Sequence, residues 1–188
     1  MALRITGGDA RGRELRQPRG ATRPTSARLR EALFSMLTAG GMLRSPVIDL
    51  YAGSGALGIE ALSRGLTECV FVESDRRTCE VIDENLRHVQ LDGGRVVLGR
   101  VGHWQPAADE RYALVLADPP YDDAAPWASI EATIADALTE DAAIAVEHAA
   151  RRTPREELAG RPLWRDRKHG DSAIAIYRPG SASREDTE

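Results

Sequence analysis

DLYAGSGALGIEA, residues 49–61, joins an apolar segment to a helical segment through a turn rich in glycine. Gly53, Gly55 and Gly58 match the pattern G-x-G-x-x-G, which lets a ligand approach the backbone N–H groups at a helix N-terminus. Glu73 ends the next apolar segment, where a carboxylate can accept hydrogen bonds from both hydroxyls of a ribose. The stretch therefore predicts a parallel α/β fold with a site for a cofactor that contains adenosine.

Strand-like and helix-like segments alternate along the rest of the chain. Apolar runs predict strands at 46–51, 68–73, 95–99, 112–117 and 142–148, and apolar spacing predicts helices at 25–37, 55–65, 75–91 and 126–139. Residues 162–179 predict two strands joined by a tight turn at 169–171, with no helix between them. This order indicates an α/β, Rossmann-like fold. Its mostly parallel, seven-stranded sheet has helices on both faces and ends in an antiparallel hairpin.

The composition is that of a folded chain without a membrane segment. The chain has 188 residues, of which 42% are hydrophobic, and this length is enough to bury a sizeable core. No segment approaches the roughly 20 apolar residues of a membrane span, and no apolar leader follows Met1, so we expect a soluble, cytoplasmic protein. The two cysteines, Cys69 and Cys79, form neither a disulfide framework nor a metal-binding pattern, so we expect reduced thiols and no metal.

Charge is distributed unevenly along the chain. The formal net charge is −4, but residues 1–30 carry eight arginines against Asp9 and Glu14. Residues 31–150 are strongly acidic, and residues 151–170 are basic again. Two basic segments that flank an acidic body favour a polyanionic partner.

Asp49 distinguishes between the cofactors that contain adenosine. A nicotinamide cofactor brings a pyrophosphate to this turn, and a carboxylate just before the turn would repel it. S-adenosylmethionine instead brings a cationic amino group and a sulfonium. Residues 49–55 resemble the acid-x-x-x-G-x-G motif of the Rossmann-like, S-adenosylmethionine-dependent methyltransferases, whose sheet also ends in an antiparallel hairpin. The resemblance implies cofactor contacts from Asp49, Tyr51, Gly53, Ser54, Gly55, Gly58, Glu73, Ser74, Val101 and Asp118.

The segment Asp118-Pro119-Pro120-Tyr121 follows the predicted strand 112–117. It resembles the (Asp/Asn)-Pro-Pro-aromatic signature of methyltransferases that act on exocyclic or amide nitrogens. The lone pair of such a nitrogen is delocalised, and two acceptors, the Asp118 carboxylate and the Pro119 carbonyl, would draw it toward tetrahedral geometry. Because prolines restrict the backbone, both acceptors are aimed in advance. Tyr121 offers a face on which a base can stack, so we expect Asp118, Pro119 and Tyr121 to be catalytic.

The basic N-terminal segment narrows the resemblance. RITGGDARGRELR (4–16) and RPTSARLREALFSML (23–37) are similar to the start of the bacterial small-subunit ribosomal RNA guanine-N2 methyltransferases. The likeness continues through residues 49–64, the Asp-Pro-Pro-Tyr segment and AIYR (175–178). It implies methyl transfer to N2 of one guanine of 16S rRNA, in an assembling small ribosomal subunit. We expect the protein to be a monomer. RNA contacts are expected from Arg4, Arg11, Arg13, Arg23, Thr25, Arg28, Arg30 and Lys168.

For several other side chains, the sequence predicts a place in the core, at the surface or beside the adenine. Relatives in this resemblance often place an acidic or amide side chain near the adenine, whereas this chain has Arg100-Val101 there, so we expect backbone contacts. Trp104 is expected in the core rather than on the adenine. Glu147 is expected outside the pocket, and His148 and His169 at the surface or in a turn.

The expected organisation has three parts. A basic hairpin extension (1–24) contacts RNA, a methyltransferase domain spans 25–178, and residues 179–188 form a disordered tail. Two alternatives stay open. An enzyme of the same fold could methylate DNA or protein glutamine, although glutamine methylation usually accompanies Asn-Pro-Pro-Tyr. A non-catalytic RNA-binding assembly protein is the other alternative, and the intact acidic and glycine positions disfavour it. Asp49 disfavours a nicotinamide oxidoreductase.

Overall fold

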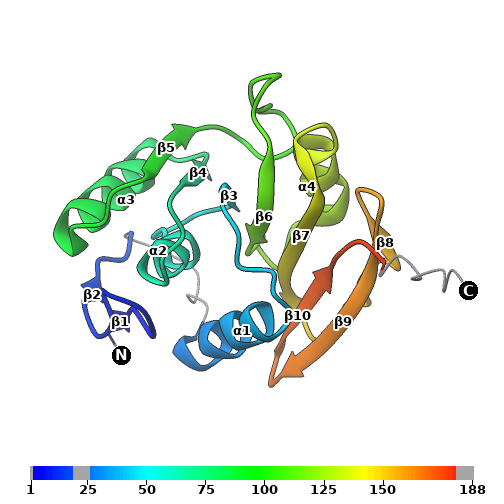
Figure 1. Cartoon of the computed structure of the whole chain (residues 1–188), viewed down its shortest axis with the longest axis horizontal. Coiled ribbons are helices and arrows are strands. Elements are labelled where there is room, and N and C mark those ends of the chain that lie inside the picture. The colour runs from blue at the N-terminus through cyan, green and yellow to red at the C-terminus, as the bar shows by residue number, and fades with distance from the viewer. Residues whose placement is uncertain (1, 19–25, 181–188) are drawn as a thin grey trace, which may run out of the picture.

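The structure, a computed structural model, describes residues 2–18 and 26–180. Arg23, Thr25 and residues 181–188 of the expected disordered tail lie outside the described residues. A single large sheet runs through the middle of the molecule (Figure 1). Five parallel strands continue at one edge into three antiparallel strands, in the order β5 (Gly94–Leu98), β4 (Cys69–Glu73), β3 (Val47–Leu50), β6 (Tyr112–Ala117), β7 (Leu138–Ala149), β10 (Ser172–Tyr177), β9 (Arg161–His169) and β8 (Glu157–Leu158).

The strand order reverses beside β3. The chain places β4 and β5 on one side of β3 and β6 and β7 on the other. In an open α/β sheet, ligands bind outside the carboxyl ends of the strands at such a reversal. The topology therefore places the expected site at the ends of β3, β4 and β6.

Helices cover both faces of the sheet. On one face lie α1 (Ala27–Ala39), α2 (Ala56–Ser63) and α3 (Arg76–Val89), and on the other lies α4 (Pro126–Ile134). Along β6, Leu114 and Leu116 belong to the core under α1 to α3, whereas Val115 and Ala117 belong to the core under α4. Successive side chains of a strand point to opposite faces, so a strand covered on both faces is apolar throughout.

Local signals set the starts of two helices. The Ser26 hydroxyl accepts a hydrogen bond from the Leu29 N–H at 3.2 Å and caps α1. The Asp75 carboxylate accepts one from the Thr78 N–H at 2.8 Å and caps α3. Both contacts satisfy backbone donors that have no partner in the first turn of a helix.

Two features of the predicted sheet need correction. The sheet has eight strands among the described residues, not seven, because Ala159 (φ 48°) and Gly160 (φ 74°) form a tight turn that returns β8 against β9. The helix predicted at 126–139 ends at Ile134, and Leu138 already pairs with Tyr112 in the sheet. The predicted edge hairpin is confirmed as β9 and β10, with its turn at 170–171.

The N-terminal extension is a hairpin, as expected. Strands β1 (Leu3–Arg4) and β2 (Glu14–Leu15) pair antiparallel, and the hairpin lies beside α2 (Figure 1). The Asp9 N–H donates to the Ser63 carbonyl at 2.8 Å, and the Ala10 N–H donates to the Ser63 hydroxyl at 3.0 Å. No helix in the described part of the chain is long and apolar enough to cross a membrane.

Candidate active site

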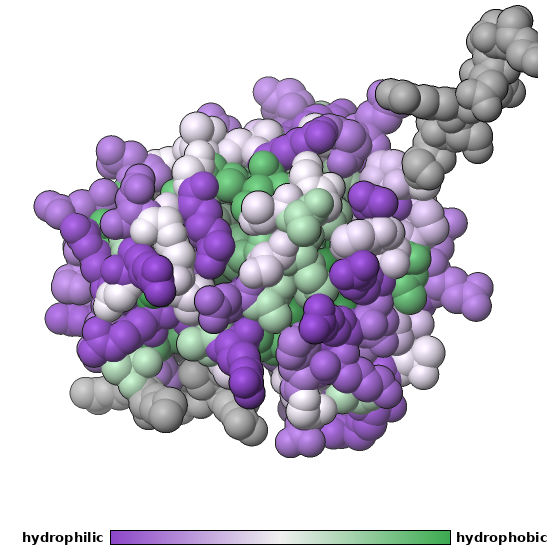
Figure 2. Space-filling model, turned by 60° about the horizontal axis from the view of Figure 1, so that its bottom comes forward, coloured by the Kyte–Doolittle hydropathy of each residue, from purple (hydrophilic) through white to green (hydrophobic). Residues whose placement is uncertain are grey.

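A cleft of about 1640 Å³ lies at the carboxyl ends of the parallel strands. Its walls come from the segments that follow β3, β4, β5 and β6, together with the start of α1 and the β9–β10 turn. In Figure 2 the molecule is turned so that the lower edge of Figure 1 comes forward. The arrowhead of β6 in Figure 1, which marks its carboxyl end, points toward this edge. The surface there is mostly hydrophilic and surrounds a group of hydrophobic residues.

The glycine turn after β3 contains three glycines with different tasks. Gly53 lines the cleft with φ 54°, and a Cβ there would meet only the Tyr51 carbonyl oxygen at 3.9 Å. A ligand can therefore approach the backbone closely at this position. Gly55, at φ 78°, and Gly58 do not line the cleft. At Gly58 a Cβ would lie 2.3 Å from the Phe71 ring, so this glycine is required for packing α2 against β4.

Asp49 lies at the buried end of the cleft. One of its carboxylate oxygens accepts a hydrogen bond from the Gly58 N–H at 2.8 Å, which fastens the first turn of α2 to β3. Burial raises the pKa of Asp49 well above its ordinary value. The Gly58 hydrogen bond opposes this rise, and the nearby Asp118 and Glu73 carboxylates add to it. A cationic group that enters the cleft would stabilise the ionised form.

Glu73 links the two turns that would surround a cofactor. One carboxylate oxygen accepts from the Gly53 N–H at 3.0 Å, and the other accepts from the N–H groups of Ser74 at 2.7 Å and Asp75 at 2.9 Å. The Ser74 hydroxyl also donates to that second oxygen at 3.2 Å. The oxygen that accepts from Gly53 has two lone pairs and a single bond, so it keeps one acceptor position for a hydroxyl group. Glu73, Ser74 and Val101 all line the cleft.

The segment after β6 forms another wall of the cleft. Asp118, Pro119 and Tyr121 all line it, and the Tyr121 side chain is partly exposed. The Tyr121 hydroxyl donates to the Glu147 carboxylate at 3.0 Å and lies 2.5 Å from the Ser172 hydroxyl. Burial, assisted by the Glu147 charge, raises the pKa of Tyr121 to about 12, whereas the Ser172 contact lowers it. The hydroxyl therefore stays protonated at neutral pH and serves as a fixed anchor for the ring.

Three residues that hold this wall are missed by the sequence prediction. Glu147 and Ser172 line the cleft and hold the Tyr121 hydroxyl, so the expectation that Glu147 lies outside the pocket is wrong. Arg152 donates to the Asp123 carbonyl at 2.9 Å and fixes the loop that follows the prolines. The position of Glu147 at the end of a predicted strand is the one sequence signal that could have indicated its place.

The structure also locates Tyr51 and the adenine-side residues. The Tyr51 hydroxyl lies 3.4 Å from the Asp123 carboxylate, and burial next to that charge raises the pKa of Tyr51 to about 12. Arg100 and Val101 line the cleft as expected, and their backbone contact to an adenine stays a prediction. Trp104 does not line the cleft and is half-buried against the core under α4. This agrees with its expected place.

The residues expected to contact RNA differ in availability. Arg11, Arg28 and Lys168 are exposed. Arg4 is exposed but paired with Glu14 at 2.9 Å. The Arg13 guanidinium, on an exposed residue, donates to the Val89 carbonyl oxygen at 2.6 Å. Their contact with RNA stays a prediction.

The prediction that Arg30 contacts RNA is wrong. The Arg30 side chain is 1% exposed and donates to the Arg4 carbonyl oxygen at 2.5 Å, so it supports the N-terminal hairpin and is not available to a phosphate. Burial lowers the pKa of Arg30, and the charges of Glu60 and Glu147 oppose that change. A helical pattern cannot distinguish a buried arginine of this kind from a surface one.

The prediction that His148 lies at the surface or in a turn is also wrong. This residue is 2% exposed, not a surface residue, and its Nε2 lies 3.1 Å from the Asp166 carboxylate. Its ring packs edge-on against Trp127, with 5.7 Å between the ring centroids. Cys69 and Cys79 are buried free thiols, as expected. Among the described residues, no group of three or more His, Cys, Asp or Glu side chains could hold a metal ion.

Comparisons with known proteins extend over most of the chain. The sequence model of the family described as "Conserved hypothetical protein 95" matches residues 3–178. The Bacillus subtilis protein named "Putative rRNA methyltransferase YlbH" is 32% identical over 187 residues, covering 94% of this chain and 98% of that protein. "Ribosomal RNA small subunit methyltransferase D" of Escherichia coli K12 is 37% identical over 120 residues, covering 63% of this chain and 60% of that protein.

Solved structures show the same architecture. The structure described as "Putative methyltransferase yhhF from Escherichia coli" superimposes with a TM-score of 0.79 at 31% identity, over 97% of this chain and 100% of that chain. A Thermus thermophilus protein of 33% identity superimposes with a TM-score of 0.78, over 94% of this chain and 99% of that chain. The Rossmann-like methyltransferase fold expected from the sequence is confirmed.

Proposed function

The chain belongs to the family described as conserved hypothetical protein 95, and from that membership we propose that it methylates N2 of a guanine in small-subunit ribosomal RNA. One observation carries this proposal. The glycine turn after β3, Glu73 at the end of β4 and the Asp-Pro-Pro-Tyr segment after β6 all line one cleft. Relatives named for small-subunit rRNA methylation support the choice of substrate.

The cofactor is S-adenosylmethionine, which supplies the methyl group as a sulfonium, and the residues of the cleft fit it. The open position at Gly53 accommodates a ligand against the backbone. The acceptor position left on the Glu73 oxygen beside Gly53 suits a ribose hydroxyl, and the Asp49 carboxylate at the cleft end suits a cationic group. Gly55 and Gly58 contribute indirectly, because they shape the turn and the helix behind it.

Asp118 and Pro119 act on the amino group of the base. The Asp118 carboxylate and the Pro119 carbonyl accept hydrogen bonds from its two N–H groups. These bonds turn its lone pair toward the methyl donor. Aimed acceptors of this kind need no reorganisation during the reaction. The methylated nitrogen gives up one proton, which passes to solvent. Holding the amine in line contributes up to roughly 7–11 kcal/mol toward lowering the barrier.

Tyr121 provides the surface against which the base lies. Its ring is partly exposed in the cleft, and its hydroxyl is anchored by Glu147 and Ser172. Stacking on an aromatic side chain contributes roughly 1–3 kcal/mol per base. A loop guanine is already partly unstacked, so its extrusion costs little.

The wider setting of the reaction follows from the same proposal. We infer that the protein acts as a monomer in the cytoplasm on an assembling small subunit. Exposed basic residues on the N-terminal hairpin and at the start of α1, Arg11 and Arg28 among them, would hold the RNA backbone.

Methyl transfer onto several substrates tests the proposed function directly. Tritiated S-adenosylmethionine is offered with undermethylated small subunits, free 16S rRNA and DNA in parallel, and the product is digested to nucleosides. We expect label in N2-methylguanosine from small subunits or 16S rRNA and none from DNA. Label in another nucleoside, or label in DNA alone, contradicts the assignment.

An Asp118 variant tests the mechanism. Asp118→Ala removes one of the two acceptors on the amino group, so we expect methyl transfer to fall at least a hundredfold. S-adenosylmethionine binding, measured by calorimetry, should stay within a few-fold. Asp118→Asn is the matched control, because its side-chain carbonyl still accepts one N–H bond and should retain part of the activity. Wild-type activity in Asp118→Ala would refute the mechanism.

A further inference from the structure

A narrow groove opens off the cleft between the start of α1 and the β9–β10 turn. It has a volume of about 340 Å³ and is lined by Ser26, Arg28 and Leu29 from the α1 side and by His169 and Gly170 from the turn. All of these residues except Arg28 also line the main cleft, so the two spaces are continuous. Arg28 is exposed and gives the groove a positive charge.

Beyond the groove, strand β9 carries arginines on the face of the sheet that α1 covers. In β10, Ile174 and Ile176 belong to the core under α1, and their partners in β9 are Arg167 and Arg165. Residues directly opposite on paired strands share a face, so both arginines lie on the α1 side. Both are exposed. Asp166, between them, points to the other face, where it contacts His148.

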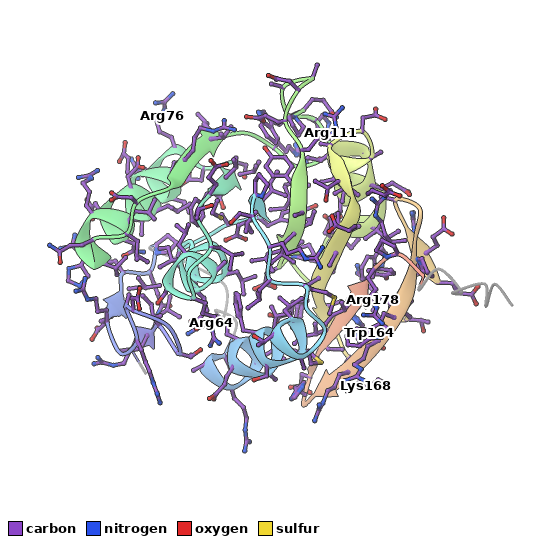
Figure 3. The ribbon with its side chains drawn as sticks, viewed as in Figure 1. Arg64, Arg76, Arg111, Trp164, Lys168 and Arg178 are labelled. Carbon is purple, nitrogen blue, oxygen red and sulfur yellow. The ribbon has the colours of Figure 1, made fainter. Side chains whose placement is uncertain are left out.

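Two arginines of this face are stacked on one tryptophan. The guanidinium carbons of Arg165 and Arg178 each lie 4.5 Å from the ring centroid of Trp164. Figure 3 shows Trp164 and Arg178 together on the hairpin, with Lys168 nearer the end of β9. A register shift between Ile176 and Tyr177 leaves Trp164 without a direct partner, and its ring packs on the core under α1.

Stacking on Trp164 orients the two guanidinium groups for binding an anion. A guanidinium on an aromatic face keeps its N–H edge free for paired hydrogen bonds to phosphate oxygens. Stacking also restricts the side chains before any ligand arrives, which lowers the entropy cost of binding. Across the described residues, neither guanidinium forms an ion pair with a carboxylate.

We propose that the RNA strand next to the target nucleotide leaves the cleft through this groove, past Arg28. Arg165 and Arg178, held by Trp164, bind phosphates of the same strand beyond the groove. The inference rests on the proposed function, because it assumes that the cleft receives a nucleotide. At about 3.3 Å per residue, Arg165 lies roughly 13 Å along β9 from the turn, so the flanking strand reaches it and the target nucleotide does not. Contacts of this kind position RNA without reading its sequence.

Salt-dependent binding of short single-stranded RNA tests this path. A trinucleotide containing guanine fills the cleft alone, and an 18-nucleotide RNA of mixed sequence extends past the hairpin. Arg165→Ala/Arg178→Ala should weaken binding of the longer RNA about tenfold. It should also reduce the slope of log affinity against log salt by about 1.4, the value for two lost contacts with single strands. Binding of the trinucleotide should not change.

A tryptophan variant separates preorganisation from charge. Trp164→Leu keeps both arginines but frees them, so binding of the longer RNA should weaken several-fold while the salt slope stays near wild type. Arg111→Ala is the matched control. Its side chain is exposed, donates to backbone carbonyls of its own loop and lies at the upper edge of Figure 3, apart from Trp164 and Arg178. It should change neither quantity.

The results distinguish the path from the proposed function. If the double variant binds the longer RNA with wild-type affinity and slope, the path is wrong, whatever the methyl-transfer assay shows. If it weakens trinucleotide and longer RNA equally, the arginines act on the cleft and the path is also wrong. The proposed function is judged separately, by transfer of label to N2-methylguanosine. Thermal unfolding of each variant verifies that the fold is retained, and the double variant leaves the packed indole in place.

Discussion

Asp49 is buried near the Asp118 and Glu73 carboxylates, and its own carboxylate accepts a hydrogen bond from the Gly58 N–H. Its raised pKa means that the folded protein binds the proton more tightly than the unfolded chain. The stabilising effect of that proton is present at low pH and is lost as the pH rises from the unfolded value through the raised pKa. An ionised Asp49 at neutral pH therefore costs stability, which a cationic ligand would offset.

Substitution of Asp49 by asparagine should separate binding from stability. The side-chain amide oxygen of the variant would still accept the Gly58 N–H, so we expect Asp49→Asn to unfold at a temperature equal to or above wild type at pH 7. Affinity for S-adenosylmethionine, measured by calorimetry, should fall about tenfold, because a charge attraction is lost. The affinity of the wild type for S-adenosylmethionine should increase as the pH rises through the raised pKa of Asp49. The affinity of Asp49→Asn should not change with pH in this way. Loss of stability as large as in Asp49→Ala would contradict this account.

The anchor on Tyr121 makes a second prediction at the residue scale. Tyr121→Phe keeps the ring but loses the hydroxyl contacts to Glu147 and Ser172, so we expect kcat to fall several-fold. Tyr121→Ala also removes the stacking face, worth roughly 1–3 kcal/mol, so kcat/KM for RNA should fall further, by about 5- to 150-fold. Steady-state kinetics on small subunits measure both. An Ala variant as active as the Phe variant would rule out stacking.

At the scale of elements, Gly58 determines how closely α2 approaches β4. A Cβ at this position would lie 2.3 Å from the Phe71 ring and 2.6 Å from the Cys69 sulfur. Gly58→Ala should therefore destabilise the protein by about 1–3 kcal/mol through overpacking, measured by urea unfolding. Adding Phe71→Leu should recover part of this loss, because the two sites are in contact. Independent, additive losses would show that the clash is relieved elsewhere.

The elements also show what a single sequence can predict. Strand β6 is predicted with its observed bounds, because a run of apolar residues before two prolines has few other interpretations. Strand β8 is missed, because two residues carry no period and depend on the turn at Ala159 and Gly160. The Asp-Pro-Pro-Tyr segment and the glycine turn, which both line the cleft, are recognised from local patterns. Arg30, Glu147 and His148 are placed by contacts between distant segments, which no local pattern contains.

At the scale of the whole molecule, the N-terminal hairpin is part of the main core. Leu3, Ile5 and Leu15 belong to the same hydrophobic cluster as the buried residues of α1 and α2. The buried Glu60 carboxylate accepts the Thr6 N–H at 2.8 Å and the Thr6 hydroxyl at 2.7 Å. Removing the hairpin would expose this apolar surface and leave a buried carboxylate with fewer partners.

A second contact joins the hairpin, α2 and α1. Arg64, labelled in Figure 3, pairs with Glu60 at 2.8 Å and donates to the Thr6 hydroxyl at 3.2 Å. Its guanidinium carbon also lies 4.9 Å from the Phe34 ring centroid, and Phe34 is a buried residue of α1. The helix α2, whose first turn lines the cleft, is therefore tied to the segment expected to contact RNA.

This shared core predicts that the hairpin and the methyltransferase body unfold together. Under native conditions, hydrogen exchange of the Thr6 amide should require nearly the same free energy as exchange in β6, because the amide is freed only when the core opens. Glu60→Gln weakens the acceptor for Thr6, so protection at Thr6 should fall by more than protection in β6. Exchange at Thr6 in the wild type that is many orders of magnitude faster than in β6 would show that the hairpin opens on its own. The basic extension would then be a separate unit, and its arginines could adapt to RNA without disturbing the cleft.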